Sequence, residues 1–492
     1  MTIEEILKLA RENKGNDAIP ELKSHRYIAQ PDTEAANKAL NPKLHDINNP
    51  VLRPDKRVKT TDDAQGESAQ KVIDTNGEST NFRTVKVARV VIALQKLIIS
   101  RAVSFCFGNA PEYNNTPENE KQEMIVKALN RILYDVKSKS LNRKIGRSIF
   151  GFKECAEYWH TVKKEKKHTK YGFPTNHKMR CTLFSPAYGD TLYPFFDETG
   201  DMVAFSRAFS RKDSKDNAVD YFETFTDKEH WLWMNGNNGY EVVAGYPKPV
   251  AIGKIPIIYG HQPKFETEDV DALIDRLETL LSNFADTNDY HASPKIFVTG
   301  QINGWAKKGD SGAVIEGEDG ATMQYVSWQQ APEAVKLEIE TLLKLIYTIT
   351  QTPDISFDSV KGLGAISGVA LKLLFMDAHL KVQDKCEIFD EYLQRRVNVI
   401  LAYIGMMNTT LEEECDQVEI EPEIVPYMIT SDLDDLNYWL TANGNKPVIS
   451  QEESVERVGL SKDPTKTIEK LKSEQSAENS FMIGEPQIDV DA

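Results

Sequence analysis

The sequence predicts an α+β fold in which a β-rich region and several long helices follow one another, and three observations lead to this prediction. Residues 151–259 alternate apolar and polar side chains, are rich in aromatic residues and are interrupted by turn signals such as "DETGD" and "NGNNG", which is typical of antiparallel strands. Residues 269–293 and 332–352 each carry one narrow apolar seam, as do helices that pack side by side in bundles. Residues 367–404 extend such a seam without a break, so we expect a third helix, roughly 57 Å long if it is straight.

The three seams consist of apolar residues three or four positions apart. The first seam contains Val270, Leu273, Leu277, Leu280 and Phe284. The second contains Val335, Ile339, Leu342, Ile346 and Ile349. The third contains Leu371, Phe375, Ala378, Val382, Cys386, Phe389, Leu393, Val397, Ile400 and Ile404.

Composition limits the function classes. The 492 residues exceed the usual size of one domain, and 59 basic residues against 75 acidic ones give a net charge of −16. This balance argues against wrapping nucleic acid in the ordinary way, which requires Lys and Arg to neutralise phosphates. The five cysteines show no framework spacing, and the apolar window 87–107 contains charged residues, so we expect a soluble protein of a reducing compartment and no membrane span.

The remaining segments complete the predicted order of elements. Residues 19–80 are polar and lack sustained periodicity, so we expect an extended arm or a long loop there. Helices are predicted at about 82–106 and 117–148, and a compact β-like insert at 295–328. A short strand, "QVEIEPEIV", follows the third long helix, and an acidic helical segment closes the chain.

The stretch "PDISFDSVKGLGAISGVALKLLF" (353–375) raises the question of nucleotide binding, because it carries three glycines before a helix. Its spacing is G-x-G-x-x-x-G, it follows a helix and a polar run instead of a buried strand, and it lacks the Gly-Lys-Ser/Thr of a phosphate-binding loop. We therefore predict that Ser367 caps the following helix. Gly362 and Gly364 leave the loop free to change conformation, without a catalytic role.

Three other clusters favour structural roles. Potential metal ligands gather within 27 residues, but none has the spacing of a structural zinc site, so no metal or other cofactor is predicted; they are Cys155, His160, His168, His177 and Cys181. The basic run "KKEKKHTK" (163–170) is predicted to be a solvated hairpin tip, with contact to nucleic acid or to an acidic partner as the alternative. Trp159, Trp231 and Trp233 are expected in the β core, and no arrangement of residues requires catalysis.

The order of these elements resembles that of the portal proteins of tailed bacteriophages, in particular the siphophage-type family. Four stretches carry the resemblance, which extends from about residue 82 to residue 473. They are "VARVVIALQKLIISRAVSFCFGNAPEY", "GKIPIIYGHQP" followed by "LIDRLETLLSNFADTNDY", "TPDISFD" with "ISGVALKLLF", and "KPVISQEESVERVGLSKDPTKTIEKLKSE". The irregular region 19–80 departs from the family pattern.

The resemblance implies a portal fold with an α/β wing, a two-helix stem, a small β-containing clip, a long channel helix and a helical crown. In residue numbers, the wing would be 1–268, the stem helices 269–293 and 332–352, the clip 294–331 and the tunnel loop 353–366. The long channel helix and the return to the wing would be 367–432, and the crown and C-terminal tail 433–492.

The resemblance also implies function and partners. The protein would be a ring of twelve subunits at one vertex of the capsid, assembled in the host cytoplasm, through which viral double-stranded DNA is packaged and ejected. It would bind terminase, which supplies the ATPase, an adaptor or head-completion protein, and the major capsid or scaffolding protein, and it would itself not be an enzyme.

Site residues follow from these parts. The tunnel loop would face DNA with Asp354, Ser356, Asp358, Lys361, Gly362, Gly364 and Ser367. Clip contacts would come from Trp305, Lys307 and Lys308. The first stem helix would present an acidic channel wall that repels phosphates and lets the duplex slide, with Asp271, Asp275, Glu278 and Asp286.

Two other function classes stay open. A different oligomeric head–tail connector or structural protein could share the acidic and helical character of the chain. A nucleotide-binding enzyme would need a phosphate cradle that the sequence does not show.

Overall fold

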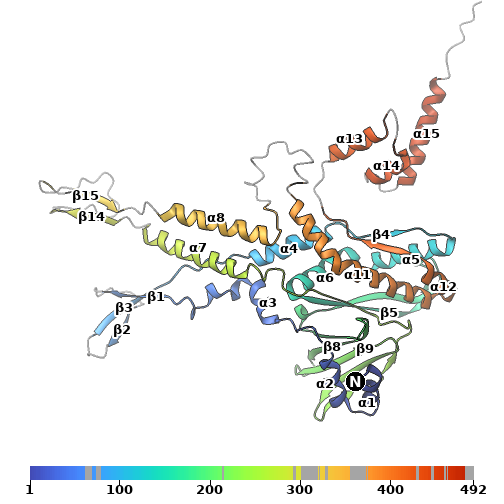
Figure 1. Ribbon diagram of the computed structural model, residues 1–492, viewed down its shortest axis with the longest axis horizontal. Coiled ribbons are helices and arrows are strands. Elements are labelled where there is room, and N and C mark those ends of the chain that lie inside the picture. Colours follow the sequence, from blue (N-terminus) through green and yellow to red (C-terminus); the bar gives the residue numbers. More distant parts are fainter. Residues whose placement is uncertain are drawn as a thin grey trace, which may run out of the picture. The chain divides into compact units, whose positions relative to one another are not determined.

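The computed structural model describes residues 1–60, 69–73, 79–212, 215–291, 295–300, 320, 322–326, 331–354, 373, 375–427, 432–444, 448–458, 461 and 464–482 (Figure 1). The chain forms two units. The first comprises Met1–Asp354 and Asp377–Tyr427, and the second comprises Ile355–Met376 and Met428–Ala492. Helices and strands are both abundant, which confirms the mixed α and β content.

An antiparallel sheet forms one part of the first unit, in the strand order β11-β10-β9-β8-β7, with β12 pairing to β10. Its strands are β7 (Thr191–Phe196), β8 (Met202–Lys212), β9 (Ala218–Phe225), β10 (Glu229–Gly236), β11 (Gly239–Val242) and β12 (Lys248–Pro249). Helices α1 (Ile3–Arg11) and α2 (Gly15–Ser24) cover one face of this sheet, and α1 begins with a capping box between Thr2 and Glu5.

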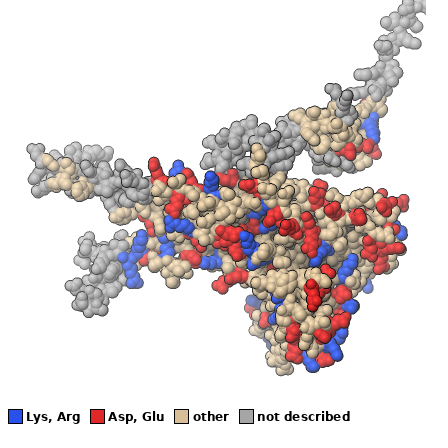
Figure 2. All heavy atoms as spheres, in the orientation of Figure 1, with Lys and Arg blue, Asp and Glu red and all other residues tan. Residues whose placement is uncertain are grey.

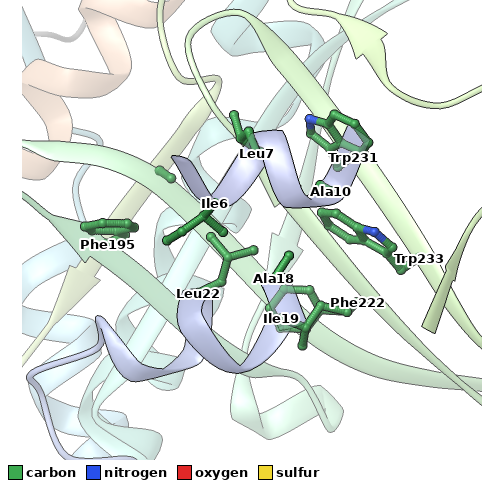
Figure 3. Close-up of a cluster of buried hydrophobic side chains, with 11 residues drawn as sticks. Ile6, Leu7, Ala10, Ala18, Ile19, Leu22, Phe195, Phe222, Trp231 and Trp233 are labelled. Atoms are coloured by element: carbon green, nitrogen blue, oxygen red, sulfur yellow. The ribbon is translucent and has the colours of Figure 1, made fainter. Parts of the chain in front are cut away.

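The side chains between these two helices and the sheet form a closed core (Figure 3). Ile6 and Ala10 of α1 and Ile19 of α2 are buried, and the rings of Trp231 and Trp233 stack at a centroid distance of 5.6 Å. The alternation of apolar and polar residues along β10 places both indoles on the same face, because side chains two positions apart in a strand point the same way. The prediction of tryptophans in the β core is confirmed.

A three-stranded sheet, β13-β5-β6, is a second sheet of the first unit. Its strands are β5 (Glu154–His168), β6 (Thr175–Phe184) and β13 (Ile257–His261), and the short helix η3 (Pro186–Tyr188) follows β6. The predicted β region and the hairpin at the basic run are therefore confirmed. Helices α4 (Leu94–Phe107), α5 (Glu120–Asp135) and α6 (Ser138–Phe152) accompany this sheet, and α4 packs on α6.

Helix α11 (Met376–Met407) joins the sheet through a buried polar network. The guanidinium of Arg396, 1% exposed, makes two hydrogen bonds to the carboxylate of Glu157, which also accepts from Trp159 Nε1 at 2.7 Å. Tyr403 Oη donates to the carbonyl of Trp159 at 2.8 Å. Most of the predicted apolar stripe of this helix is buried, namely Ala378, Val382, Phe389, Leu393, Val397, Ile400 and Ile404, so the prediction is confirmed for them.

Helix α7 (Asp271–His291) leads to the two-stranded pair β14 (Lys295–Thr299) and β15 (Thr322–Val326), and α8 (Ala331–Ile349) returns beside α7 (Figure 1). Both predicted seams meet here in one core with α4, built around Val270, Ile274, Leu277, Leu342 and Ile346. Ile349, at the end of the second seam, is 47% exposed.

The region 19–80 differs from the prediction of an arm or loop. It contains most of α2, then α3 (Thr33–Leu40), the short helices η1 (Pro42–Leu44) and η2 (Asp46–Asn48), and β1 (Lys56–Thr60), β2 (Ala69–Ile73) and the start of β3 (Ser79–Val85). The strands pair in the order β1-β3-β2. The helix predicted from residue 82 begins only at Leu94, because residues 86–93 follow the surface of α7 instead.

The first unit ends with η4 (Thr409–Leu411), α12 (Glu412–Gln417) and β16 (Ile420–Glu423), which pairs with β4 (Glu112–Asn115). The second unit contains α13 (Asp432–Ala442), α14 (Gln451–Val458) and α15 (Pro464–Met482), as predicted for the C-terminal helices. An ion pair of 2.6 Å between Lys472 and Glu452 joins α15 to α14. Within the described residues, no helix combines the length and apolar character that a membrane span requires.

Candidate functional site

A strap of residues 86–92 lies along α7 and is held by the helix's polar side chains. Three backbone amides of the strap donate to three side chains that are spaced four residues apart on α7. Ala88 N bonds to Asp286 Oδ1 at 2.7 Å, Val90 N to Ser282 Oγ at 2.9 Å, and Ile92 N to Glu278 Oε1 at 2.8 Å.

The match of these spacings explains why an irregular segment can follow a helix. Amides two residues apart in an extended chain are separated by about 6.6 Å along the chain. Side chains four residues apart on an α-helix are separated by about 6.0 Å and lie on the same side of it. Every second amide of the strap therefore meets the next polar side chain of α7, and these amides need no strand partner.

Residues before β1 complete this contact. His45 Nδ1 lies 2.7 Å from Glu278 Oε1, and both side chains are almost fully buried. Arg53 donates to Asn283 Oδ1 at 2.9 Å and to Asp286 Oδ2 at 3.0 Å. The N-terminal region is thus an integral layer on α7, attached through charged hydrogen bonds.

This N-terminal layer covers two of the four acidic residues that the sequence predicts to line a channel. Glu278 is 1% exposed and Asp286 is occupied by the strap and by Arg53, which corrects the prediction of an open acidic face for these two residues. The Asp275 residue is exposed, but partial desolvation of its carboxylate, followed by the nearby Asp46 carboxylate, raises its pKa. Asp271 is half-buried, and burial raises its pKa as well. For Asp271 and Asp275 the channel role stays a prediction.

The loop predicted at 353–366 leaves α8 from a fixed point. Gln351 adopts a left-handed backbone with φ of 48°, and Thr352 N bonds to the carbonyl of Tyr347 at 2.9 Å, which ends the helix. Arg101 of α4 then donates to the carbonyl of Pro353 at 2.6 Å, and its guanidinium lies 5.8 Å from the centroid of the Tyr347 ring.

Lys381 of α11 contacts the same end of α8. Its ammonium group donates to the carbonyl of Thr350 at 2.8 Å and pairs with Glu266 at 2.6 Å. Lys385, one turn later on α11, pairs with the same carboxylate at 2.9 Å. Since the side chains of Lys381 and Glu266 are 7% and 5% exposed, one buried carboxylate joins the end of α8, the start of α11 and the segment after β13.

The predicted loop and clip residues fall largely outside the part of the chain that the structure describes. Ser356, Asp358, Lys361, Gly362, Gly364 and Ser367 of the predicted tunnel loop lie there, as do Trp305, Lys307 and Lys308 of the predicted clip. Asp354 is described and directly follows the Arg101-bound Pro353. Their predicted roles stay predictions.

The cysteine and histidine cluster takes up structural positions. Cys155 is fully buried, Cys181 lies opposite Trp159 in the β5–β6 pair, and burial raises the pKa of both thiols. His168 Nε2 is 3.1 Å from the carbonyl of His177 inside the hairpin. Among the described residues, no three His, Cys, Asp or Glu side chains come together as a metal site.

Five residues that hold these contacts carry no recognisable signal in the sequence: His45, Arg53, Arg101, Glu266 and Lys381. Each pairs with a group far away in the sequence, so no local pattern marks it. One signal was available: Glu278, Ser282 and Asp286 repeat every four residues beside the apolar seam, which indicates a second, polar contact line on α7.

Comparisons with known proteins give one family. The family model "Phage portal protein, SPP1 Gp6-like" matches residues 41–480. No curated protein matches the chain. Among solved structures, the chain is similar to one titled "Neck of native GTA particle computed with C12 symmetry", at 9% identity over 75% of this chain and 90% of that chain, with a TM-score of 0.37. It is also similar to "Virion of native gene transfer agent (GTA) particle", at 10% identity over 75% of this chain and 88% of that chain, with a TM-score of 0.32.

Proposed function

The chain belongs to the phage portal protein family of the SPP1 Gp6-like type, and from this premise we propose that it forms a ring at one capsid vertex through which double-stranded DNA is packaged and ejected. The ring has twelve subunits and is part of the virion, and it assembles in the host cytoplasm. Terminase docks on it and supplies the ATPase, while the portal subunit itself performs no catalysis.

One observation carries this proposal. The family match spans the whole succession of α7, the β14–β15 pair, α8, residues 353–366 and α11. The end of α8, where the predicted loop begins, is held by a buried cluster of Lys381, Glu266 and Lys385, here called the ionic knot. A loop that contacts moving DNA must transmit force to the ring without pulling its base out of the subunit. Lys381, Glu266 and Arg101 provide such a base, because hydrogen bonds to buried charged groups are among the stronger ones in proteins.

The charge of the chain fits a channel that does not hold its cargo. A DNA duplex carries about one negative charge per 1.7 Å of its axis, so an acidic wall keeps it from binding tightly. In this proposal, Asp275 and Asp271 of α7 contribute to the wall, and the loop residues 353–366, with Lys361 as the single cation, make weak contacts with the passing duplex.

We assign each proposed partner protein to one region of the subunit. Residues 294–331, with Trp305, Lys307 and Lys308, contact the adaptor or head-completion protein at one end of the ring. The helices of the second unit form the crown inside the capsid, and the outer wing meets the major capsid or scaffolding protein.

A packaging assay tests the role of the loop. Gly362→Pro with Gly364→Pro fixes φ, whereas Gly362→Ala with Gly364→Ala adds a Cβ without closing a ring on the backbone nitrogen and serves as the control. We expect rings from both variants, and a much lower packaging rate from the proline pair than from the alanine pair. Wild-type packaging by the proline rings would show that the loop does not act on DNA.

A further inference from the structure

The hairpin of β5 and β6 carries a concentration of positive charge that the portal role does not use. Residues 163–180, here called the basic hairpin, contain seven cationic side chains and one carboxylate, in a chain whose net charge is −16. None of the seven forms an ion pair within the described residues. They are Lys163, Lys164, Lys166, Lys167, Lys170, Lys178 and Arg180.

The basic hairpin is a fixed structure and presents its charges outward. Tyr171 and Phe173 at its turn are buried, and Tyr171 Oη accepts a hydrogen bond from Met179 N at 3.2 Å. The register pairs Val162 with Lys178, so this exposed valine shares a face with that lysine. The five lysines from 163 to 170 are all exposed. A preformed surface of this kind loses little entropy when it binds a partner.

The opposite charge gathers on another surface of the same unit. Residues 384–423 contain eleven carboxylates against three cations, and each of these cations is already paired inside the chain: Lys385 with Glu266, Arg395 with Glu391, and Arg396 with Glu157. The space-filling view shows the acidic side chains gathered over α5, α11 and α12 (Figure 2). The acidic face is defined here by Asp384, Glu387, Asp390, Glu419, Glu421 and Glu423.

This face is hollowed. A groove of about 650 Å³ lies between α11 and β16 and is lined by Asp390, Glu421 and Glu423. Arg395 also lines the groove, but it pairs with Glu391. Burial, together with the Glu421 and Glu423 carboxylates, raises the pKa of Asp390, so like charges crowd there. Such crowding is relieved by a positively charged partner.

An adjoining cavity of about 730 Å³ contains polar groups that lack a partner. Asp384, Glu387 and Glu391 line it from α11, as do Lys381, Lys385 and Arg395, each of which is paired within the chain. Gln262 is 3% exposed and Tyr392 1% exposed, and both line the cavity, yet Gln262 Nε2 and Tyr392 Oη make no hydrogen bond within the described residues. Buried polar groups in proteins are normally satisfied, so these two indicate a ligand with acceptor groups, as a peptide backbone has.

We propose that the basic hairpin of one subunit docks on the acidic face of a neighbouring copy of this chain, with its lysines against the carboxylates of α11 and β16. The inference rests on the proposed ring. A contact between two different surfaces of identical subunits is heterologous, which is the type that closes rings. The two surfaces are complementary in charge, and most of their charged side chains form no ion pair within the described residues, Asp384 with Lys385 being an exception. This complementarity favours a second copy over DNA as the partner.

Charge reversal tests the contact. The hairpin variant carries Lys163→Glu, Lys164→Glu, Lys166→Glu and Lys167→Glu. The face variant carries Glu387→Lys, Asp390→Lys, Glu419→Lys and Glu421→Lys. A control reverses four exposed lysines elsewhere, Lys8, Lys43, Lys139 and Lys144. Mass photometry measures the protein concentration at which half of the subunits are in rings, and circular dichroism checks that each variant is folded.

Each variant alone places like charges opposite each other, so we expect that concentration to rise at least about tenfold, while the control changes it less than about threefold. A mixture of the two variants is the decisive sample. The reversed hairpin then meets the reversed face and each unchanged surface meets its ordinary counterpart, so alternating rings should form as readily as wild-type rings.

Three results overturn the inference: rings from either variant alone at the wild-type concentration, a mixture that does not recover, or a hairpin variant that keeps its rings but loses affinity for a short DNA duplex. The last result assigns the hairpin to DNA. If the wild-type protein forms no rings, the proposed function itself is contradicted. If the wild-type protein forms rings and both variants form them at the same concentration, only this contact is contradicted.

Discussion

The Glu278 carboxylate of α7 binds the ring of His45 at 2.7 Å and, through the same oxygen, the amide of Ile92 at 2.8 Å. One side chain thus attaches two separate N-terminal segments to the helix. His45 Nε2 also lies 3.2 Å from the carbonyl of Ala39, so the imidazole connects the end of α3 to α7. The N-terminal residues form part of the helix pair's support and are not an appendage.

Removing this carboxylate should weaken the first unit. Glu278→Ala leaves His45 and the Ile92 amide buried without their partner, and we expect the free energy of unfolding to fall by about 3 kcal/mol. Urea denaturation followed by tryptophan fluorescence measures it. Asp289→Ala, on an exposed part of the same helix, is the control and should change it by less than about 0.5 kcal/mol. Equal effects of both substitutions would show that the buried pair has no special role.

Because every second amide of the strap is hydrogen-bonded to α7, we expect an alternating pattern of amide hydrogen exchange. The amides of Ala88, Val90 and Ile92 are bonded to α7, whereas those of Arg89 and Val91 have no partner within the described residues. Residue-resolved exchange should therefore find slow exchange at 88, 90 and 92 and fast exchange at 89 and 91. Ser282→Ala should accelerate exchange at Val90 most. Uniform exchange across residues 88–92 would contradict the hydrogen bonds between the strap and α7.

The ionic knot at the loop base predicts a combined defect in stability and packaging. Lys381→Met removes the donor to the Thr350 carbonyl and one of the two cations on Glu266, so we expect a loss of about 2–4 kcal/mol in unfolding free energy. Rings should still form but package DNA more slowly. Lys344→Met, at an exposed position of α8, is the matched control and should package normally. Normal packaging by Lys381→Met rings would show that the ionic knot is not needed for the loop's action on DNA.

The cysteines should be unreactive in the folded protein. Burial raises the pKa of Cys106 and of Cys415 to about 12 and that of Cys386 to about 11, so at pH 8 only about one Cys386 thiol in a thousand is ionised. A thiol-specific disulfide reagent at this pH should label the native chain very slowly and all five cysteines once urea is added. Rapid labelling of a native cysteine would place it outside the core described here.

Elements whose apolar pattern has a regular period could be predicted from the sequence. The stripe on α11 from Ala378 to Ile404 is buried as its spacing indicates, and the alternating segments of 151–259 form strands. The strap could not be predicted, because its amides bond to side chains almost 200 residues away and it has no apolar period. The burial of Glu278 could not be predicted for the same reason. Its charge favoured an exposed position on a channel wall, and its partner His45 lies on a distant segment of the chain.

The central claim, that this chain is the subunit of a portal ring, is tested most directly by electron microscopy of the purified protein combined with a mass measurement. We expect closed rings with a central channel and a mass near twelve times that of the 55.6-kDa chain. Particles of a single chain at every protein concentration and salt concentration, or open fibres without a channel, would contradict it.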